Sequence, residues 1–103
     1  MNEMELRHLR CFLAVAEAGS LTVAVAKKLN TSQLYLSRQI RDLENEVGVK
    51  LFRRGRRSNV ELTAAGQTFL EHARNVLLQV DLATDAARRA DTSTTATLLA
   101  DFR

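Results

Sequence analysis

Proline is absent from this chain of 103 residues, and glycine occurs only 4 times. Because sandwiches and barrels of β-strands need many tight turns, which these two residues usually make, the composition favours helices joined by short loops. Hydrophobic residues make up 46% of the chain and charged residues 26%, as in ordinary globular domains. We therefore expect a mainly α fold with a buried core.

The composition also bears on the compartment in which the protein works. No apolar run approaches the roughly 20 residues that span a bilayer, and residues 1–5 lack the basic end and apolar stretch of a signal peptide. The single cysteine, Cys11, can form neither an intrachain disulfide nor a cysteine-based zinc site. These features predict a cytoplasmic protein with no membrane contact, no metal and no cofactor.

Apolar residues at intervals of three and four predict three helices in the first half of the chain. The first covers residues 6–18 and ends at Gly19, and Ser20 can cap the second, which points Leu21, Ala24, Val25 and Leu29 inward. Residues 30–31 make a short break. Thr31 or Ser32 can cap the third helix, which covers residues 32–48 and buries Leu36, Ile40, Leu43 and Val47 before Gly48 stops it.

A β-hairpin is expected next. Residues 49–52 and 59–62 can form two short strands, because Val60 and Leu62 alternate with polar residues, and the loop between the strands contains Gly55.

A long fourth helix is predicted over residues 64–90, with Thr63 as its cap. Its apolar positions follow the alternating steps of three and four that are typical of a coiled-coil seam. The seam consists of Leu70, Ala73, Leu77, Val80, Thr84 and Ala87, and it is widened by Phe69, Val76 and Ala83. A lone helix of this length would leave part of the seam in water, so we expect a second copy of the chain to cover it. Residues 91–103 are predicted to form a flexible tail.

The positive charge is concentrated in the first two-thirds of the chain. Residues 1–66 hold eleven basic and seven acidic side chains, whereas residues 67–103 hold four basic and five acidic ones. The densest stretch, residues 50–57, has five basic side chains and no acid. Such a stretch beside a helical domain indicates a polyanionic partner, although a merely solubilising loop would have the same composition.

The third helix carries side chains that suit a nucleic acid on its outward face. Its first half offers Gln, Arg, Ser and Tyr without any acid, while the acids begin at Asp42. Gln can pair with adenine, Arg with guanine, and apolar Leu34 or Tyr35 can contact a thymine methyl. The short second helix and tight break before it have helix-turn-helix spacing. The alternative is an ordinary solvated helix face.

At this point the sequence resembles the N-terminal domain of LysR-type transcriptional regulators. The resemblance covers residues 5–90 and is carried by the ordered motifs Leu6-Arg7-His8-Leu9-Arg10, Ala14-Val15-Ala16-Glu17, Gly19-Ser20-Leu21-Thr22, Thr31-Ser32-Gln33, Leu36-Ser37-Arg38-Gln39-Ile40-Arg41-Asp42-Leu43-Glu44, and Leu62-Thr63-Ala64-Ala65-Gly66. It implies a winged helix-turn-helix over residues 1–63 and a dimerising linker helix over residues 64–90. It also implies a regulator that binds pseudo-palindromic promoter DNA and belongs to no enzyme class.

The resemblance assigns roles to individual positions. The major-groove residues would be Gln33, Leu34, Tyr35, Ser37 and Arg38, with Ser32 at the helix start. Phosphates would be held by Ser20, Thr22, Thr31, Arg41 and Arg54, and the wing residues Arg56 and Arg57 would reach toward the minor groove. The dimer interface would contain Phe69, Leu70, Ala73, Val76, Leu77, Val80, Ala83, Thr84 and Ala87.

The chain departs from the family pattern in two respects. Leu34 replaces a usual proline, which puts the half-site preference in doubt. Family members also continue into a sensor domain that binds a small effector, and residues 92–103 do not resemble its first strand. We therefore expect a fragment or truncated product whose full-length parent can be a tetramer and binds any effector only through the missing C-terminal domain.

Two other functions agree less well with the sequence. An enzyme is disfavoured, because His8 and His72 are far apart and can both be helix-surface residues, while Cys11 suits a half-buried inert thiol. The stronger rival is a protein-docking module with a helical head. A protein contact that is mainly apolar should barely respond to salt, whereas nucleic-acid affinity should fall steeply.

Overall fold

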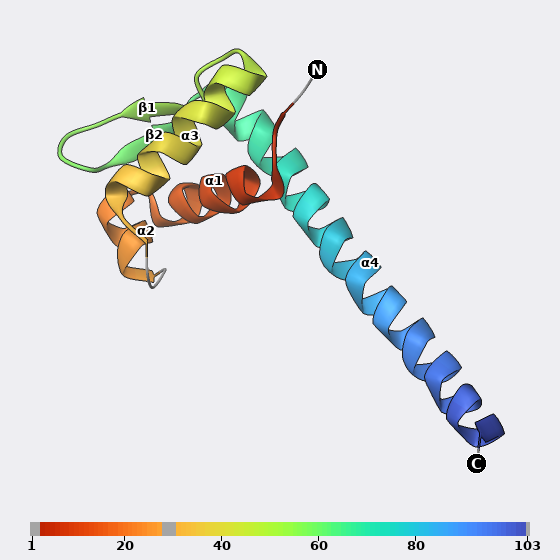
Figure 1. The fold of residues 1–103 in the computed structure, drawn as a ribbon. Coiled ribbons are helices and arrows are strands. Elements are labelled where there is room, and N and C mark those ends of the chain that lie inside the picture. The colour runs from red at the N-terminus through yellow and green to blue at the C-terminus, as the bar shows by residue number, and fades with distance from the viewer. Residues whose placement is uncertain (1–2, 28–30, 103) are drawn as a thin grey trace.

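The computed structural model describes residues 3–27 and 31–102, and it has the predicted architecture of three helices, a hairpin and a long helix (Figure 1). The elements are α1 (Leu6–Ala18), α2 (Leu21–Lys27), α3 (Gln33–Val47), β1 (Phe52–Arg54), β2 (Val60–Leu62) and α4 (Ala64–Phe102). The fold class is therefore confirmed as a mainly helical winged helix-turn-helix followed by a long helix. Leu29 and the break at Asn30 lie outside the described residues.

The helix ends follow the local signals in the sequence. Gly19 and Gly48 end α1 and α3 with φ of 68° and 91°, the left-handed conformation that glycine adopts without steric cost. The Ser20 hydroxyl accepts the Val23 N–H at the start of α2. Of the two candidate caps for α3, the structure uses Ser32, whose hydroxyl accepts the Tyr35 N–H at 3.1 Å.

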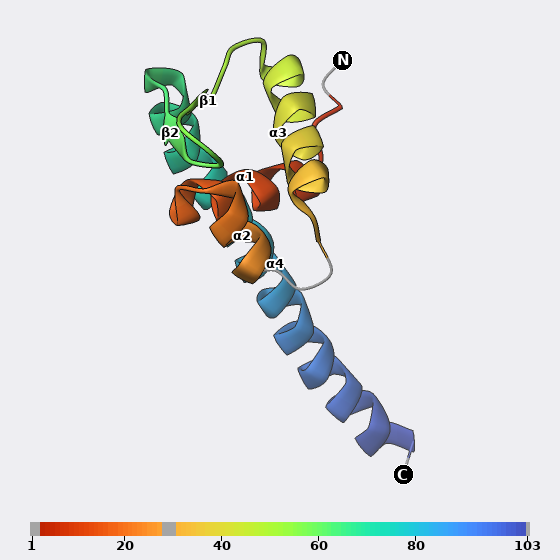
Figure 2. The same cartoon turned by 90° about the vertical axis from the view of Figure 1, so that its left-hand side faces the viewer.

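The core lies where α1 crosses α3 and the first turns of α4, at the end of α4 nearest the hairpin (Figures 1 and 2). Phe12 of α1 is fully buried at its centre. Its ring contacts Phe52 of β1 with centroids 5.1 Å apart, and it meets Phe69 of α4 edge-on at 5.2 Å. Three elements that are distant in sequence thus meet on one aromatic ring. We call residues 3–63 the head.

The first strand of the hairpin begins later than predicted. Residues 49–52 were expected, but β1 is Phe52–Arg54, which pairs antiparallel with β2 from Phe52↔Leu62 to Arg54↔Val60. The Leu51 carbonyl still accepts the Thr63 N–H in the hairpin register, but the Leu51 N–H donates to Glu44 Oε2 and is not paired across the hairpin. Arg53 and Arg54 therefore lie on a strand and not in the loop.

The start of α4 is locked against the hairpin. The Thr63 hydroxyl accepts the Gly66 N–H at 3.0 Å and donates to the Lys50 carbonyl at 2.7 Å, which confirms Thr63 as the cap. Gly66 passes so close to Leu51, the residue before β1, that a Cβ there would overlap the Leu51 carbonyl oxygen. The head and α4 are therefore joined without a flexible linker.

The end of α4 was predicted wrongly. The helix continues past Ala90 to Phe102, through the stretch that was expected to be a non-helical tail. No proline or glycine follows Gly66, and Thr, Ser and Ala each cost a helix well under about 1 kcal/mol. Nothing in the sequence therefore breaks the helix. It projects away from the head, and the molecule measures 64 Å along its longest axis (Figure 1).

Candidate nucleic-acid interface

The N-terminal half of α3 presents the predicted reading residues to solvent. Leu34 is 62% exposed and Tyr35 42%, and Gln33 and the two arginines Arg38 and Arg41 are exposed as well. Ser37 is half-buried. The opposite side of the helix buries Leu36, Ile40 and Leu43 in the core, as the apolar spacing predicted. The side chains of this face are therefore available to a ligand that lies along the helix.

A basic cleft separates α3 from β1. It has a volume of about 340 Å³ and is lined by Leu34, Ser37, Arg38, Arg41, Glu44, Lys50, Phe52 and Arg54. Four cationic residues from α3, β1 and the connection between them thus face one hollow, although they are spread over 17 positions of the sequence from 38 to 54. Opposed cations of this kind attract a polyanion.

Glu44 is the one acid among the residues that line this cleft, and its carboxylate is bound within the chain. Its Oε2 accepts the N–H groups of Leu51 at 2.7 Å and Phe52 at 3.1 Å, and Lys50 Nζ lies 3.7 Å from Oε1. Glu44 is buried, unlike the exposed acids Asp42 and Glu46 of the same helix. No local signal marks this role, because the backbone groups it binds are seven and eight residues away.

The tip of the hairpin is a tight turn of residues 55–59. The Gly55 N–H donates to the Asn59 carbonyl, and the Asn59 N–H donates to the Arg56 carbonyl. Arg57 has φ of 58° in this turn, and both Arg56 and Arg57 are exposed. The base of the turn is attached to the junction of α1 and α2, since the Leu21 N–H donates to the Ser58 carbonyl and the Val60 N–H to the Gly19 carbonyl.

One polar contact connects the turn to the start of α3. Gln33 Nε2 donates to Thr22 Oγ1 at 3.0 Å, and the Ser58 hydroxyl donates to Gln33 Oε1 at 3.1 Å. The sequence had assigned Gln33 to base contacts and Thr22 to phosphate, and it had not singled out Ser58. The structure brings all three residues together, and a link across 25 positions has no signature in the sequence.

Two predicted phosphate anchors do not present their hydroxyls to solvent. Ser20 is buried and its hydroxyl caps α2. Thr31 Oγ1 is buried, and within the described residues it has no hydrogen-bond partner. The phosphate contacts that the resemblance implies for both residues stay predictions, and these hydroxyls would have to become accessible to make them. Thr22 and Ser32 remain exposed.

The predicted dimer seam divides into two parts. Ala73 is 1% exposed and Leu77 6%, because both pack into the core of their own chain, with Phe69 and Leu70 partly buried beside them. The exposed part is an apolar groove of about 450 Å³ lined by His72, Asn75, Val76, Gln79, Val80 and Ala83. Thr84 and Ala87 are also exposed. The seam available to a partner is thus Val76, Val80, Ala83, Thr84 and Ala87.

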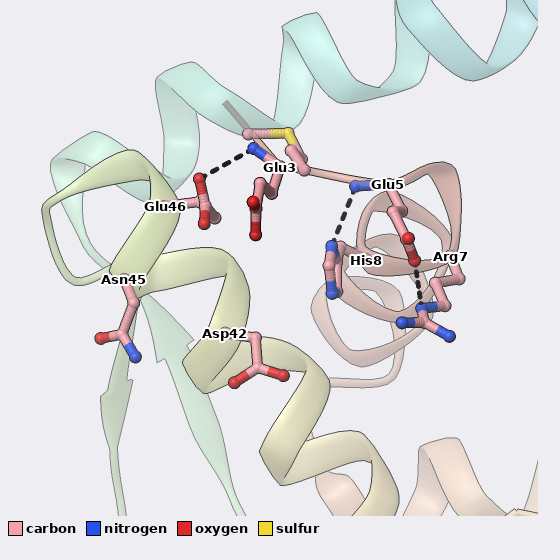
Figure 3. A pocket seen from close by; sticks show the side chains of 8 residues that line it. Glu3, Glu5, Arg7, His8, Asp42, Asn45 and Glu46 are labelled. Carbon is pink, nitrogen blue, oxygen red and sulfur yellow. Dashed lines mark hydrogen bonds and ion pairs between the residues drawn. The ribbon is translucent and has the colours of Figure 1, made fainter. Parts of the chain in front are cut away.

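A second hollow, of about 610 Å³, lies between residues 3–5, α1 and the second half of α3 (Figure 3). Its lining is mainly acidic, with Glu3, Glu5, Asp42 and Glu46 around it, so it repels a polyanion. His8, expected on the helix surface, is instead buried here, and its Nδ1 accepts the Glu5 N–H at 3.0 Å.

Other site classes find no support in the part of the chain that the structure describes. Across residues 3–27 and 31–91, no group of His, Cys, Asp or Glu side chains has the arrangement to hold a metal ion. Cys11 is buried. None of the described helices combines the length and the apolar character that crossing a membrane requires.

Comparisons with known proteins show which family the chain is similar to. A family model described as "Bacterial regulatory helix-turn-helix protein, lysR family" matches residues 6–67. The Hca operon transcriptional activator HcaR of Escherichia coli is 57% identical over 86 residues, which cover 84% of this chain and 28% of that protein. The chain therefore spans little more than a quarter of this relative.

Two solved structures of DNA complexes have similar folds. The complex of the CbnR DNA-binding domain with DNA matches with a TM-score of 0.77 and 46% identity, covering 84% of this chain and 98% of that one. The complex of the BenM DNA-binding domain with catB site 1 DNA matches with a TM-score of 0.80 and 42% identity, covering 87% and 95%. In both cases nearly the whole solved domain is covered.

Proposed function

We propose, from the premise that this chain belongs to the LysR family of bacterial regulatory helix-turn-helix proteins, that it binds a specific double-stranded DNA site as a homodimer and thereby regulates transcription. The chain carries the DNA-binding domain of that family. Its relatives are named as transcriptional regulators, in agreement with the expectation that it is not an enzyme.

The observation that carries this proposal is the basic cleft beside an acid-free helix face. Arg38 and Arg41 project from α3 toward the cleft, and Lys50 and Arg54 line it from the hairpin side. A duplex docked on α3 would place bases against Gln33, Leu34, Tyr35, Ser37 and Arg38, and phosphates against Arg41 and Arg54. Arg56 and Arg57 at the hairpin tip would reach the neighbouring groove.

The dimer would form through the exposed part of α4. Val76, Val80, Ala83, Thr84 and Ala87 share one side of the helix, and none of them belongs to the core cluster of the described residues. Within this side the Thr84 hydroxyl donates to the Val80 carbonyl at 2.8 Å. Two copies joined there would hold two α3 helices at a fixed separation, so the site would be pseudo-palindromic, with half-sites one helical turn or more apart.

Further properties of the full-length regulator follow the family. We place the protein in the cytoplasm, where its DNA lies. Tetramer formation and the response to a small effector would depend on a C-terminal sensor domain beyond these 103 residues.

In-vitro selection of bound duplexes from a random pool tests the proposal and returns the half-site and its spacing together. We expect enrichment of one inverted repeat, with affinity for it falling by about 0.9 log units per phosphate contact for each log unit of salt. A chain that enriches no sequence and binds no duplex in dilute buffer is not a DNA-binding protein. Salt-insensitive binding to another protein would then favour the docking module.

A further inference from the structure

The side-chain amide of Gln33 makes one hydrogen bond at each end within the protein. Its Nε2 donates to Thr22 Oγ1 at 3.0 Å, and its Oε1 accepts from the Ser58 hydroxyl at 3.1 Å. These contacts connect the first residue of α3 to the second residue of α2 and to the tip of the hairpin. The amide thus adds a side-chain link between α3 and the hairpin turn to the backbone bond that joins the turn to Leu21 of α2.

The hairpin needs such a tie. Its strands are only three residues long, and a two-stranded hairpin of this size has little stability of its own. The C-terminal end of α3 is fixed to β1 through Glu44, which binds the N–H groups of Leu51 and Phe52. The N-terminal end of α3 meets the hairpin tip through Gln33 and Ser58. The two attachments are therefore at opposite ends of the cleft.

We propose that Gln33 is a positioning residue, which sets the angle between the hairpin and α3 and so holds the arginines on the two sides of the basic cleft at a fixed spacing. The inference rests on the proposed DNA-binding function. If the tie between Gln33 and Ser58 opens, the turn of residues 55–59 keeps only its backbone bonds to residues 19–21. Arg54, Arg56 and Arg57 then approach the duplex from a range of angles, and part of the binding free energy is lost in ordering them.

This role differs from base reading by the same residue. A glutamine that served only to pair with a base would not depend on its bond to Ser58. Removing the Ser58 hydroxyl would then leave affinity unchanged or raise it. A positioning residue gives the opposite result, because the loss of Ser58 breaks the same tie as the loss of Gln33.

The test is a double-mutant cycle on the full 103-residue chain, with Ser58→Ala, Gln33→Ala and the double variant, measured on the selected duplex. We expect each single change to weaken binding about three- to ten-fold, and the double change to weaken it no further than the stronger single change. Ser58→Thr, which keeps the hydroxyl, should restore near-normal affinity. Thr68→Ala, which removes an exposed hydroxyl on α4, should have no effect.

Two outcomes of the cycle overturn the proposal. Unchanged or tighter binding by Ser58→Ala would mean that Gln33 acts on the DNA alone. Losses that add in the double variant would mean that Ser58 and Gln33 contact the DNA independently.

A second measurement needs no DNA. Amide hydrogen exchange in the free protein should become several-fold faster at Leu21 and Asn59 in both Gln33→Ala and Ser58→Ala, because these N–H groups bond at the base and inside the turn. Unchanged exchange in both variants also overturns the proposal. Failure of the wild-type chain to bind any duplex would instead remove the proposed function, while this exchange result would still report on the tie.

Discussion

The two halves of α4 have the same apolar spacing but different surroundings. Residues 64–77 bring Phe69, Ala73 and Leu77 into the core of the head, whereas residues 81–91 are exposed throughout. The first half is ordered by tertiary packing within one chain. The second half depends on its own helix propensity and on whatever covers its exposed seam. A regular apolar stripe therefore specifies a helix without specifying which partner buries it.

The strongest way to break the packed half is to fill Gly66. In Gly66→Ala, the new methyl group would overlap the Leu51 carbonyl oxygen and approach Leu62 Cδ2 to 3.0 Å. Because the obstacle is backbone, α4 must move away from Leu51, and we expect the head to lose about 3 kcal/mol or more. Thermal unfolding followed by circular dichroism measures the loss.

Gly55→Ala is the matched control for that substitution. The nearest atom to its new methyl group would be the Asn59 carbonyl oxygen at 3.5 Å, which is ordinary contact distance. It should leave the unfolding temperature almost unchanged. Equal stability of the two variants would mean that the close contact between Gly66 and the Leu51 carbonyl does not stabilise the packing of α4 on the head.

Glu44→Ala should have the next largest effect. It compares a buried polar contact with an exposed one on the same helix. Removing the carboxylate leaves the N–H groups of Leu51 and Phe52 buried without their acceptor. We expect a loss of about 2–3 kcal/mol in the free energy of unfolding. Urea titration measures it, with Glu46→Ala on the exposed side of the same helix expected to cost less than about 0.5 kcal/mol. Comparable losses would contradict the anchoring role of Glu44.

Local contacts could be predicted from the sequence, whereas contacts between distant segments could not. Gly19, Gly48, Ser32 and Thr63 were recognised because a helix end is decided by residues within one turn of it. Glu44 and the Gln33–Ser58 tie were missed because their partners are brought close only by the fold.

The dimer seam was overestimated for a related reason. Periodicity shows which side of α4 is apolar, but it does not show that the head covers Ala73 and Leu77. The helix was likewise ended too early at Ala90, because a weakly helical composition was taken as a stop signal although no residue there breaks a helix.

Arg38→Ala tests the exposed reading face of the head. We expect a loss of roughly 1–3 kcal/mol on the selected duplex together with a flatter preference among bases, since Arg38 would contact base edges. Replacing Arg56 and Arg57 by Ala should instead weaken binding to all duplexes and lower the salt slope by about two. Titrations of specific and random duplex at several salt concentrations separate these effects. The same response in both variants would remove the division between reading and phosphate contact.

The smallest expected effect concerns the exposed seam of α4, which begins at Val76 within the packed half of the helix. Val76 is 44% exposed on the open seam, while its neighbour Leu77 is buried in the head. Val76→Asp should therefore weaken dimerisation about tenfold or more, roughly 1.4 kcal/mol, without lowering the stability of the head.

Sedimentation equilibrium measures the dimer, and thermal unfolding measures the head. Leu82→Asp is the matched control. Leu82 is 48% exposed, and at 100° per residue it lies on the opposite side of α4 from the buried Ala73. Its dimer should stay intact. If Leu82→Asp dissociates the pair and Val76→Asp does not, the two copies meet on the opposite side of α4, and the seam continuous with the core is left to another part of the full-length protein.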